Sequence, residues 1–349
     1  MSKAAKTTLI ILSVILALTA AAAIAYFTVG KKYYITRIET YSFPESTFIY
    51  ITPQDNAESV RTKIEELGGE TAGEAFAIYA EHNKFDNKKH SGKFELKDGD
   101  TMRDIYNRIV SNTQTPVKLN IKSTRHLDMC VGDICEQLMM DSTELSEFTG
   151  SNAYKMALGY TKETFPSLFL ADTYEVYWDI KPEDLMVRIM KEHTKFWNAE
   201  RKAKAEKMGM TPAEVATLAS IVESETKDFE EQPIVAGLYI NRLKKGIKLE
   251  SDPTVLFTLK DPEKQRVYNK DLKTDSPYNT YMYAGLPPGP IRNPSKKGID
   301  NVLNYKEHDY LFMCAKEDLS GRHNFAKTLK EHEKNAKLYH QALDNRGIK

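Results

Sequence analysis

Two glutamates near the end of one predicted helix are the residues best suited, by type and spacing, to acid/base chemistry. They lie in the segment Ile221-Val222-Glu223-Ser224-Glu225. On a helix, Glu223 projects above small side chains, where a ligand could approach. Glu225 instead extends the apolar stripe of the helix, which predicts partial burial. We expect Glu223 to be the acid/base and Glu225 to be its rival; the alternative is that both are solvated surface residues.

The segment before these glutamates has strong helix-start signals. Thr211 is a predicted N-cap, Pro212 occupies the first helical position and Glu214 completes a capping box. The helix is therefore expected to run from this point to about Thr226. A second helix follows and is expected to end at Gly246.

Loops rich in proline, tyrosine and polar residues are predicted after these helices, at 251–254, 276–281 and 285–290. Rigid aromatic and amide-bearing loops suit a carbohydrate cleft, because sugar faces pack on rings and hydroxyl groups need fixed hydrogen-bond partners. Such loops are weak evidence alone, since proline-rich turns are common in proteins without a sugar site.

An ordered set of motifs over about residues 210–340 resembles the endolytic murein transglycosylase family (MltG/YceG-like). The motifs are Leu218-Ala219-Ser220-Ile221-Val222-Glu223-Ser224-Glu225-Thr226, Asn241-Arg242-Leu243, Ser251-Asp252-Pro253-Thr254-Val255, Tyr278-Asn279-Thr280-Tyr281, Gly285-Leu286-Pro287-Pro288-Gly289 and His323-x-Phe325 with His332. The chain departs from the family pattern at Ala171, Ser224 and Glu250, where proline, lysine and glutamine are common. Of these, Glu250 could alter the charge near the cleft.

The resemblance implies cleavage within nascent peptidoglycan strands, which limits strand length. The bond cut would be the β-1,4 bond from N-acetylmuramic acid to N-acetylglucosamine, leaving a 1,6-anhydro end. One carboxyl group suffices, because the C6 hydroxyl of the sugar attacks C1 in place of water. Glu223 would protonate the leaving oxygen and then accept the hydroxyl proton, with burial raising its pKa beforehand.

Further site residues are expected around this glutamate. Asp252, Tyr278, Asn279 and Tyr281 would hold the sugar or orient Glu223, although the tyrosines could equally pack the loop. His323 would hydrogen-bond in the cleft or pin the C-terminal segment. The remaining supporting candidates are Glu225, Asn241, Glu250, Ser251 and Thr280.

Two other functions remain open. A hydrolytic muramidase would use Glu223 with a second carboxylate, such as Asp252 or Glu250. A non-catalytic peptidoglycan-binding or division-scaffold protein would bind glycan without cutting it. The partners expected are peptidoglycan strands, the inner membrane and, by family analogy, peptidoglycan synthases.

The N-terminal segment is expected to be a transmembrane anchor. Residues 7–30 carry no charge, and the 21 residues from Leu9 to Val29 span about 30 Å as a helix, the thickness of the hydrocarbon layer. A cleaved signal peptide is the alternative, but its apolar core is usually shorter. We expect a cytoplasmic tail at 1–6, a β-rich juxtamembrane segment at 31–44, and an extracytoplasmic body on a single-pass inner-membrane protein.

The fold class expected for the body is α+β, in three parts. Residues 45–113 read as a compact α+β module that looks like the family's LysM-like domain. Residues 114–207 form a connecting α+β region, and residues 208–349 form the mixed α/β catalytic domain.

Composition argues against several partners. Lys+Arg and Asp+Glu are equal at 49 each, so no overall field favours nucleic acid. Cys130 and Cys135 lack the partner ligands of a zinc site, so neither a metal nor a cofactor is expected. The two cysteines either form a local disulfide or are two small buried thiols.

Overall fold

The computed structural model describes residues 3–85, 90–259, 264 and 266–347. Two compact units emerge from it. The first comprises residues 1–117 and 175–179, and the second comprises residues 118–174 and 180–349. The mixed α+β class is confirmed for the described residues.

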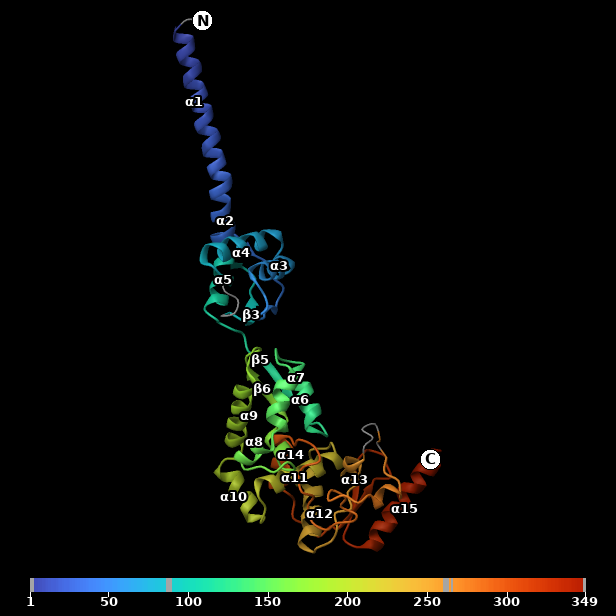
Figure 1. Ribbon diagram of the computed structural model, residues 1–349. Coiled ribbons are helices and arrows are strands. Elements are labelled where there is room, and N and C mark those ends of the chain that lie inside the picture. The colour runs from blue at the N-terminus through green and yellow to red at the C-terminus, as the bar shows by residue number, and fades with distance from the viewer. Residues whose placement is uncertain (1–2, 86–89, 260–263, 265, 348–349) are drawn as a thin grey trace. The chain divides into compact units, whose positions relative to one another are not determined.

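A long helix lies at the N-terminus (Figure 1). It runs through α1 (Lys3–Ala25), the π-helical η1 (Tyr26–Gly30) and α2 (Lys31–Arg37). From Ala5 to Arg37 it is long and apolar enough to cross a membrane, and its apolar side chains from Leu9 to Val29 are exposed. It is therefore compatible with a single-pass anchor. Part of the tail predicted at residues 1–6 lies outside the described residues.

The prediction of a β-rich stretch just after the apolar segment is wrong over most of its length. Helix α2 continues to Arg37, and only β1 (Thr40–Tyr41) is a strand. The reason is tertiary: Ile35 is 3% exposed and packs in the core of the first unit, which holds this segment in the helix started upstream.

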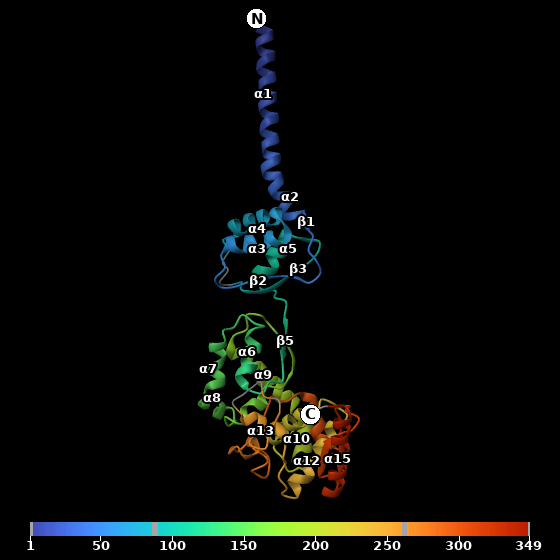
Figure 2. The same ribbon diagram turned by 90° about the vertical axis from the view of Figure 1, so that its right-hand side faces the viewer.

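In the rest of the first unit, helices cover a two-stranded antiparallel sheet. Strand β2 (Thr47–Ile51) pairs with β3 (Gly92–Leu96), and Ile49 lies opposite Phe94 in the core. Figure 2 shows the helices on one side of these strands. The other elements of this unit are α3 (Ala57–Gly68), α4 (Glu70–Asn83), β4 (Asp100–Thr101) and α5 (Met102–Val110).

The mixed α+β content predicted for residues 45–113 is confirmed, and local caps explain where two of its helices begin. Asn56 caps α3 and Thr101 caps α5, each in a full capping box. Alternate side chains of β3 are buried, as expected of a strand with one face on a core. The likeness of this unit to a LysM domain stays a prediction.

The second unit is mainly helical. Its elements in chain order are β5 (Val117–Ile121), α6 (Leu127–Cys135), α7 (Ser142–Gly150), α8 (Asn152–Ala157), η3 (Phe165–Leu168), β6 (Asp172–Val176), α9 (Pro182–Phe196), α10 (Ala199–Lys207), α11 (Pro212–Glu225), α12 (Gln232–Lys244), α13 (Asp252–Thr258), η4 (Asp271–Lys273), α14 (Lys296–Leu303), β7 (Phe312–Ala315), β8 (His323–Ala326) and α15 (Leu329–Asn345). Strand β5 pairs with β6, and β7 with β8.

Helix α11 is the centre of this unit (Figure 1). It contacts α10, α12, α13, α14 and η3, and every residue from Val215 to Val222 is buried. The predicted start is confirmed, since Thr211 caps the helix in a box with Glu214. A helix buried on all sides cannot be read from an amphipathic stripe alone. Its last turn carries both glutamates.

The loop predicted at 251–254 is partly helical. Helix α13 begins at Asp252 with Pro253 in its first turn. Proline is favoured there because it has no N–H to satisfy and its φ already suits a helix. By contrast, Gly246 ends the preceding helix with φ of +66°, as predicted.

Residues predicted as a separate connecting region pack in the same unit as the predicted catalytic region. Arg201 of α10 forms an ion pair with Asp300 of α14, at 2.7 Å between Nε and Oδ1. The Asn293 amide donates to the Lys122 carbonyl at 2.7 Å. A boundary at residue 207 stays a prediction.

The cysteines are free thiols. Cys130 and Cys135 both lie on α6, where a separation of five residues turns the side chains about 140° apart. Cys130 is buried and Cys135 is partly exposed.

Candidate active site

A cavity of about 300 Å³ lies at the C-terminal end of α11. Of the two glutamates, Glu225 is the one that lines it. Four further predicted site residues, Glu250, Asp252, Tyr281 and His323, line the same cavity. Its other walls come from α12 and from the β7–β8 hairpin. Segments about a hundred residues apart in sequence therefore meet around one carboxyl group.

Two hydroxyl groups hold the Glu225 carboxyl. The Tyr239 hydroxyl donates to Oε1 at 2.7 Å, and the Ser251 hydroxyl donates to the same oxygen. Burial raises the pKa of Glu225 above its ordinary value, although the bonds from Ser251 and Tyr239 act in the opposite direction. Glu225 is therefore harder to ionise than an ordinary glutamate, but its carboxylate form can accept hydrogen bonds from two hydroxyl groups.

Glu223 has a different environment. Its carboxyl accepts hydrogen bonds from the Ser295 backbone N–H, at 3.2 and 3.3 Å, and from the Ser295 hydroxyl. Ser295 is the N-cap of α14, and a Cβ at Gly298 would lie 2.4 Å from the Glu223 carboxyl carbon. Burial raises the pKa of Glu223, while Ser295 and Arg292 oppose this shift. Glu223 is therefore packed against the start of α14 and is not among the residues lining the cavity.

Asp252 and Tyr281 form the polar pair nearest to solvent. The Tyr281 hydroxyl donates to Oδ1 of Asp252 at 2.6 Å. Burial and this hydrogen bond both raise the pKa of Tyr281. Asp252 itself is exposed, so an entering ligand can reach this pair.

His323 lines the cavity and is held in place by Glu231. Its backbone N–H donates to Glu231 at 2.7 Å, and its Nδ1 lies 2.9 Å from the other carboxylate oxygen. Glu231 is 5% exposed. The two roles weighed for His323, in the cleft and in pinning the C-terminal segment, are thus geometrically compatible.

The predicted Glu250 lines the cavity in an ion pair with Arg242. Glu250 has φ of +53°, in the left-handed region. The Arg242 guanidinium also donates to the carbonyls of Lys248 at 2.8 Å and Leu311 at 3.0 Å. Arg242 therefore ties α12 to the strand side of the cavity, and its charge compensates Glu250.

Four other predicted site residues do not line the cavity but hold together the segments around it. Their side chains are directed to the backbone or to neighbouring side chains. The Asn241 amide donates to the His308 carbonyl, the Asn279 amide donates to the carbonyls of Leu272 and Thr274, Thr280 accepts from the Ser251 N–H, and the Tyr278 ring packs 4.7 Å from that of Phe257.

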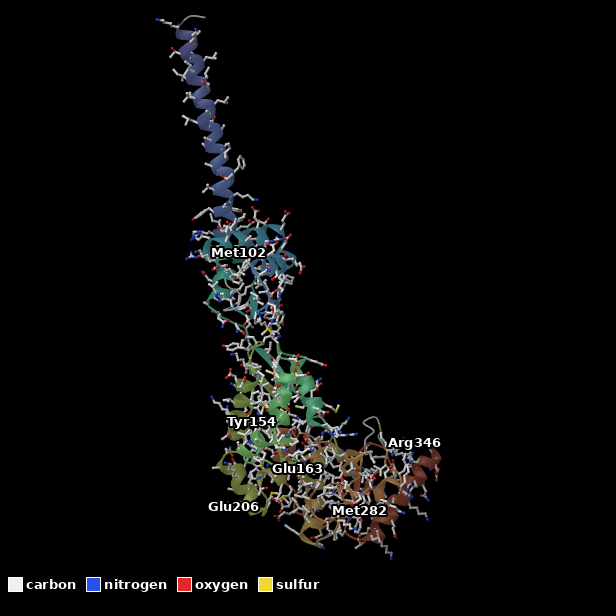
Figure 3. The ribbon with its side chains drawn as sticks, in the orientation of Figure 1. Met102, Tyr154, Glu163, Glu206, Met282 and Arg346 are labelled. Carbon is white, nitrogen blue, oxygen red and sulfur yellow. The ribbon has the colours of Figure 1, made fainter. Side chains whose placement is uncertain are left out.

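The proline-rich segment borders another hollow. Leu286, Pro287 and Pro288 line a separate cavity of about 690 Å³. Gly289 is needed for close approach, because a Cβ there would lie 2.0 Å from the carbonyl oxygen of Glu163, which is labelled in Figure 3. This motif therefore packs against the segment around Glu163.

Sequence reasoning did not single out Tyr239, Glu231 or Ser295 as site residues. Each acts through a contact far away in the chain, so no local spacing indicated it. Arg242 was visible within the Asn241-Arg242-Leu243 motif, although its role becomes clear only from its ion pair with Glu250 and its bonds to two backbone carbonyls. Among the described residues, no group of three or more His, Cys, Asp or Glu is arranged to hold a metal ion.

A carboxyl group with a raised pKa that lines a cavity beside fixed polar side chains is the arrangement expected of an acid/base site. The sequence profile of the YceG-like family matches residues 49–338. The chain therefore belongs to the YceG-like family.

Named relatives agree with this family. The chain is 37% identical over 161 residues to an endolytic murein transglycosylase of Bacillus subtilis, covering 46% of this chain and 44% of the relative. It is 24% identical over 314 residues to one of Streptococcus pneumoniae, covering 80% of this chain and 56% of the relative. The chain thus spans about half the length of these relatives.

A solved structure shares the fold. It is a 2.6 Å crystal structure of a yceG-like protein from Listeria monocytogenes. The match has a TM-score of 0.55 and 26% identity, and covers 82% of this chain and 98% of the other.

Proposed function

We propose that this chain is an endolytic lytic transglycosylase of peptidoglycan. It would cut the bond from N-acetylmuramic acid to N-acetylglucosamine and leave 1,6-anhydro ends, so limiting the length of nascent strands. The family membership and the names of the relatives support the reaction. The observation that carries the proposal is the buried Glu225 carboxyl in a cavity with Asp252, Tyr281 and His323.

The same observation favours Glu225 over Glu223 as the acid/base. Glu225 is the last residue of α11, where the negative end of the helix dipole disfavours a carboxylate. Glu223 faces the positive end of α14, where a carboxylate is favoured. A general acid must be protonated before the reaction, so the environment of Glu225 suits the role better. Glu223 would then accept hydrogen bonds at the start of α14 and pack against Gly298.

A single carboxyl group can complete the reaction. Glu225 gives its proton to the glycosidic oxygen as the C1–O bond breaks. The C6 hydroxyl of the muramyl residue then attacks C1, and the Glu225 carboxylate takes the hydroxyl proton as the anhydro ring closes. Tyr239 and Ser251 donate to the carboxylate that exists between these steps, and Glu225 ends protonated, as it began.

A hydrolytic muramidase is the second candidate, and one observation favours it. Asp252 lines the cavity with Glu225 and is oriented by the Tyr281 hydroxyl at 2.6 Å. A retaining or inverting hydrolase needs such a second carboxylate. Its products would carry reducing ends in place of anhydro ends.

The proposal extends to the rest of the chain. The helix from Ala5 to Arg37 would anchor the protein in the inner membrane with the body outside the cytoplasm. The LysM-like first unit would bind peptidoglycan, and peptidoglycan synthases would be neighbours at the membrane. An anchored cutter reaches only strands close to the bilayer, which fits nascent glycan as the substrate.

The test compares Glu225→Gln with Glu223→Gln on purified peptidoglycan, using mass spectrometry of the products. We expect anhydro-muramyl ends from the native chain, their loss in Glu225→Gln and substantial activity in Glu223→Gln. The opposite pattern would return the catalytic role to Glu223. Reducing ends alone would favour the hydrolase, and intact strands from the native chain would favour a scaffold.

A further inference from the structure

A second cavity, of about 340 Å³, has wall residues adjacent in sequence to those of the first and a different charge character. Two arginines, Arg125 and Arg292, line it, and no acidic residue does. Its other walls include Met129, Leu256 and Ile291. The cavity is therefore a cationic hollow with apolar walls, whereas the first cavity contains Glu225, Glu250 and Asp252.

The arginine-bearing segments are tied together. Arg292 donates from Nε to the Ser123 hydroxyl at 2.7 Å and from Nη2 to the Ser123 carbonyl at 3.0 Å. The next residue, Asn293, accepts from the Thr124 N–H at 2.6 Å and donates to the Lys122 carbonyl at 2.7 Å. The segment leading to Arg125 is thus held against the segment that carries Arg292, which limits the entropy lost when an anion binds between them.

Adjacent residues of the chain form walls of both cavities. Ser224 lines the second cavity and Glu225 the first. Pro253 lines the second cavity and Asp252 the first. Neighbouring Cα atoms are about 3.8 Å apart, so the walls of the two cavities approach each other closely at both of these places.

We propose that the second cavity is a subsite for the carboxylate of the muramyl side chain; this rests on the proposed function. The anion is either the lactyl carboxylate or a carboxylate of the peptide attached to it. Arginine suits this group, because its planar fork matches a carboxylate. The walls from Met129, Leu256 and Ile291 suit the methyl groups that flank such carboxylates in lactyl and alanyl units. The subsite would make the enzyme select muramyl positions by their acidic substituent.

The experiment measures cleavage and binding with the full chain in detergent. The variant is Arg125→Gln, with Arg125→Lys to restore charge. The matched control is Arg346→Gln, which removes an exposed arginine near the C-terminus, labelled in Figure 3. Three glycan probes are used: peptide-bearing strands, strands stripped of peptides so that lactyl carboxylates are free, and stripped strands with those carboxylates converted to neutral amides.

We expect Arg125→Gln to raise KM about tenfold or more on one or both acidic probes, the loss typical of a charge-assisted hydrogen bond. Little change in kcat, partial rescue in Arg125→Lys and no change in Arg346→Gln are also expected. The acidic probe that shows the effect identifies the source of the carboxylate. An equal loss on the neutral amide probe would overturn the inference, as would unchanged KM on both acidic probes.

Binding separates this inference from the proposed function. The probes are titrated into Glu225→Gln with and without the Arg125→Gln change, so no chemistry is required. Weaker binding of acidic probes alone supports the subsite, even if the cleavage products turn out to be hydrolytic. Absence of any glycan binding and cleavage would overturn both proposals, whereas binding unaffected by Arg125→Gln would overturn the subsite alone.

Discussion

Replacing Ser251 by alanine should move the alkaline limb of the pH–rate profile to higher pH. The Ser251 hydroxyl donates to the Glu225 carboxyl and thereby lowers its pKa against the effect of burial. Without that donor, the carboxylate is less stable and the proton is held to higher pH. Because the general acid must be protonated, activity should persist further into the alkaline range.

The size of the shift follows from the hydrogen bond. A hydrogen bond to a charged group contributes about 1.5–3 kcal/mol, and one pKa unit corresponds to about 1.4 kcal/mol. The Tyr239 hydroxyl remains on the same oxygen and partly compensates the loss. We therefore expect the alkaline limb of kcat to move up by about one unit.

Ser295→Ala is the matched control. Ser295 donates to Glu223 as Ser251 donates to Glu225, so each variant removes one hydroxyl from one of the two glutamates. Ser295 also caps α14, and its loss should cost about 1 kcal/mol of stability without moving the alkaline limb. The assay is the initial rate of glycan cleavage across the pH range at saturating substrate. A shift in Ser295→Ala with none in Ser251→Ala would refute Glu225 as the acid.

Three further predictions concern stability and reactivity. Burial raises the pKa of Glu225, so the unfolded chain ionises first as pH rises and the native chain loses stability above the ordinary glutamate range; Glu225→Gln should lack this loss, so the Tm of the native chain should fall relative to that of the variant as pH rises above that range. Gly298→Ala should destabilise the fold by about 1–3 kcal/mol by crowding Glu223, whereas Gly132→Ala on α6, with open space around it, should be neutral or stabilising in thermal unfolding. Burial raises the pKa of Cys130 to about 12, so this thiol should resist alkylation at pH 8 until the chain unfolds, as followed by mass spectrometry.

Local chemistry made much of the fold predictable. The capping boxes at Thr101 and Thr211 satisfy backbone groups within a few residues, so their signals are complete in the sequence. The turn at Gly246 is similar, since its positive φ favours glycine. The segment after residue 30 failed as a strand because its helical state depends on Ile35 packing in a core built from later residues. Propensity alone carries no information on that contact.

The choice between the two glutamates could not be made from helix geometry. Periodicity fixes the angle between Glu223 and Glu225 around α11, but the partner on each face is set by segments much later in the chain. Ser295, more than seventy residues on, covers Glu223, and Ser251 covers Glu225. The small residues beside Glu223 predicted room for an approaching ligand. What approaches them is the start of α14, so a surface that reads as open in sequence is used for packing.

Under the proposed function, the two carboxyl groups of this short segment would have different roles, one structural at Glu223 and one chemical at Glu225. Both are buried enough for the pKa to rise, so burial alone does not distinguish them. The difference lies in what surrounds each group: the backbone N–H and hydroxyl of Ser295 at a helix start for Glu223, and the hydroxyl groups of Tyr239 and Ser251 beside a cavity for Glu225. A group that must hold and release one proton in each cycle needs neither form to be strongly favoured. Burial at the end of α11 destabilises the carboxylate form of Glu225, whereas the hydrogen bonds from Tyr239 and Ser251 stabilise it. Because neither form is strongly favoured, Glu225 could release and regain one proton in each cycle of the proposed reaction.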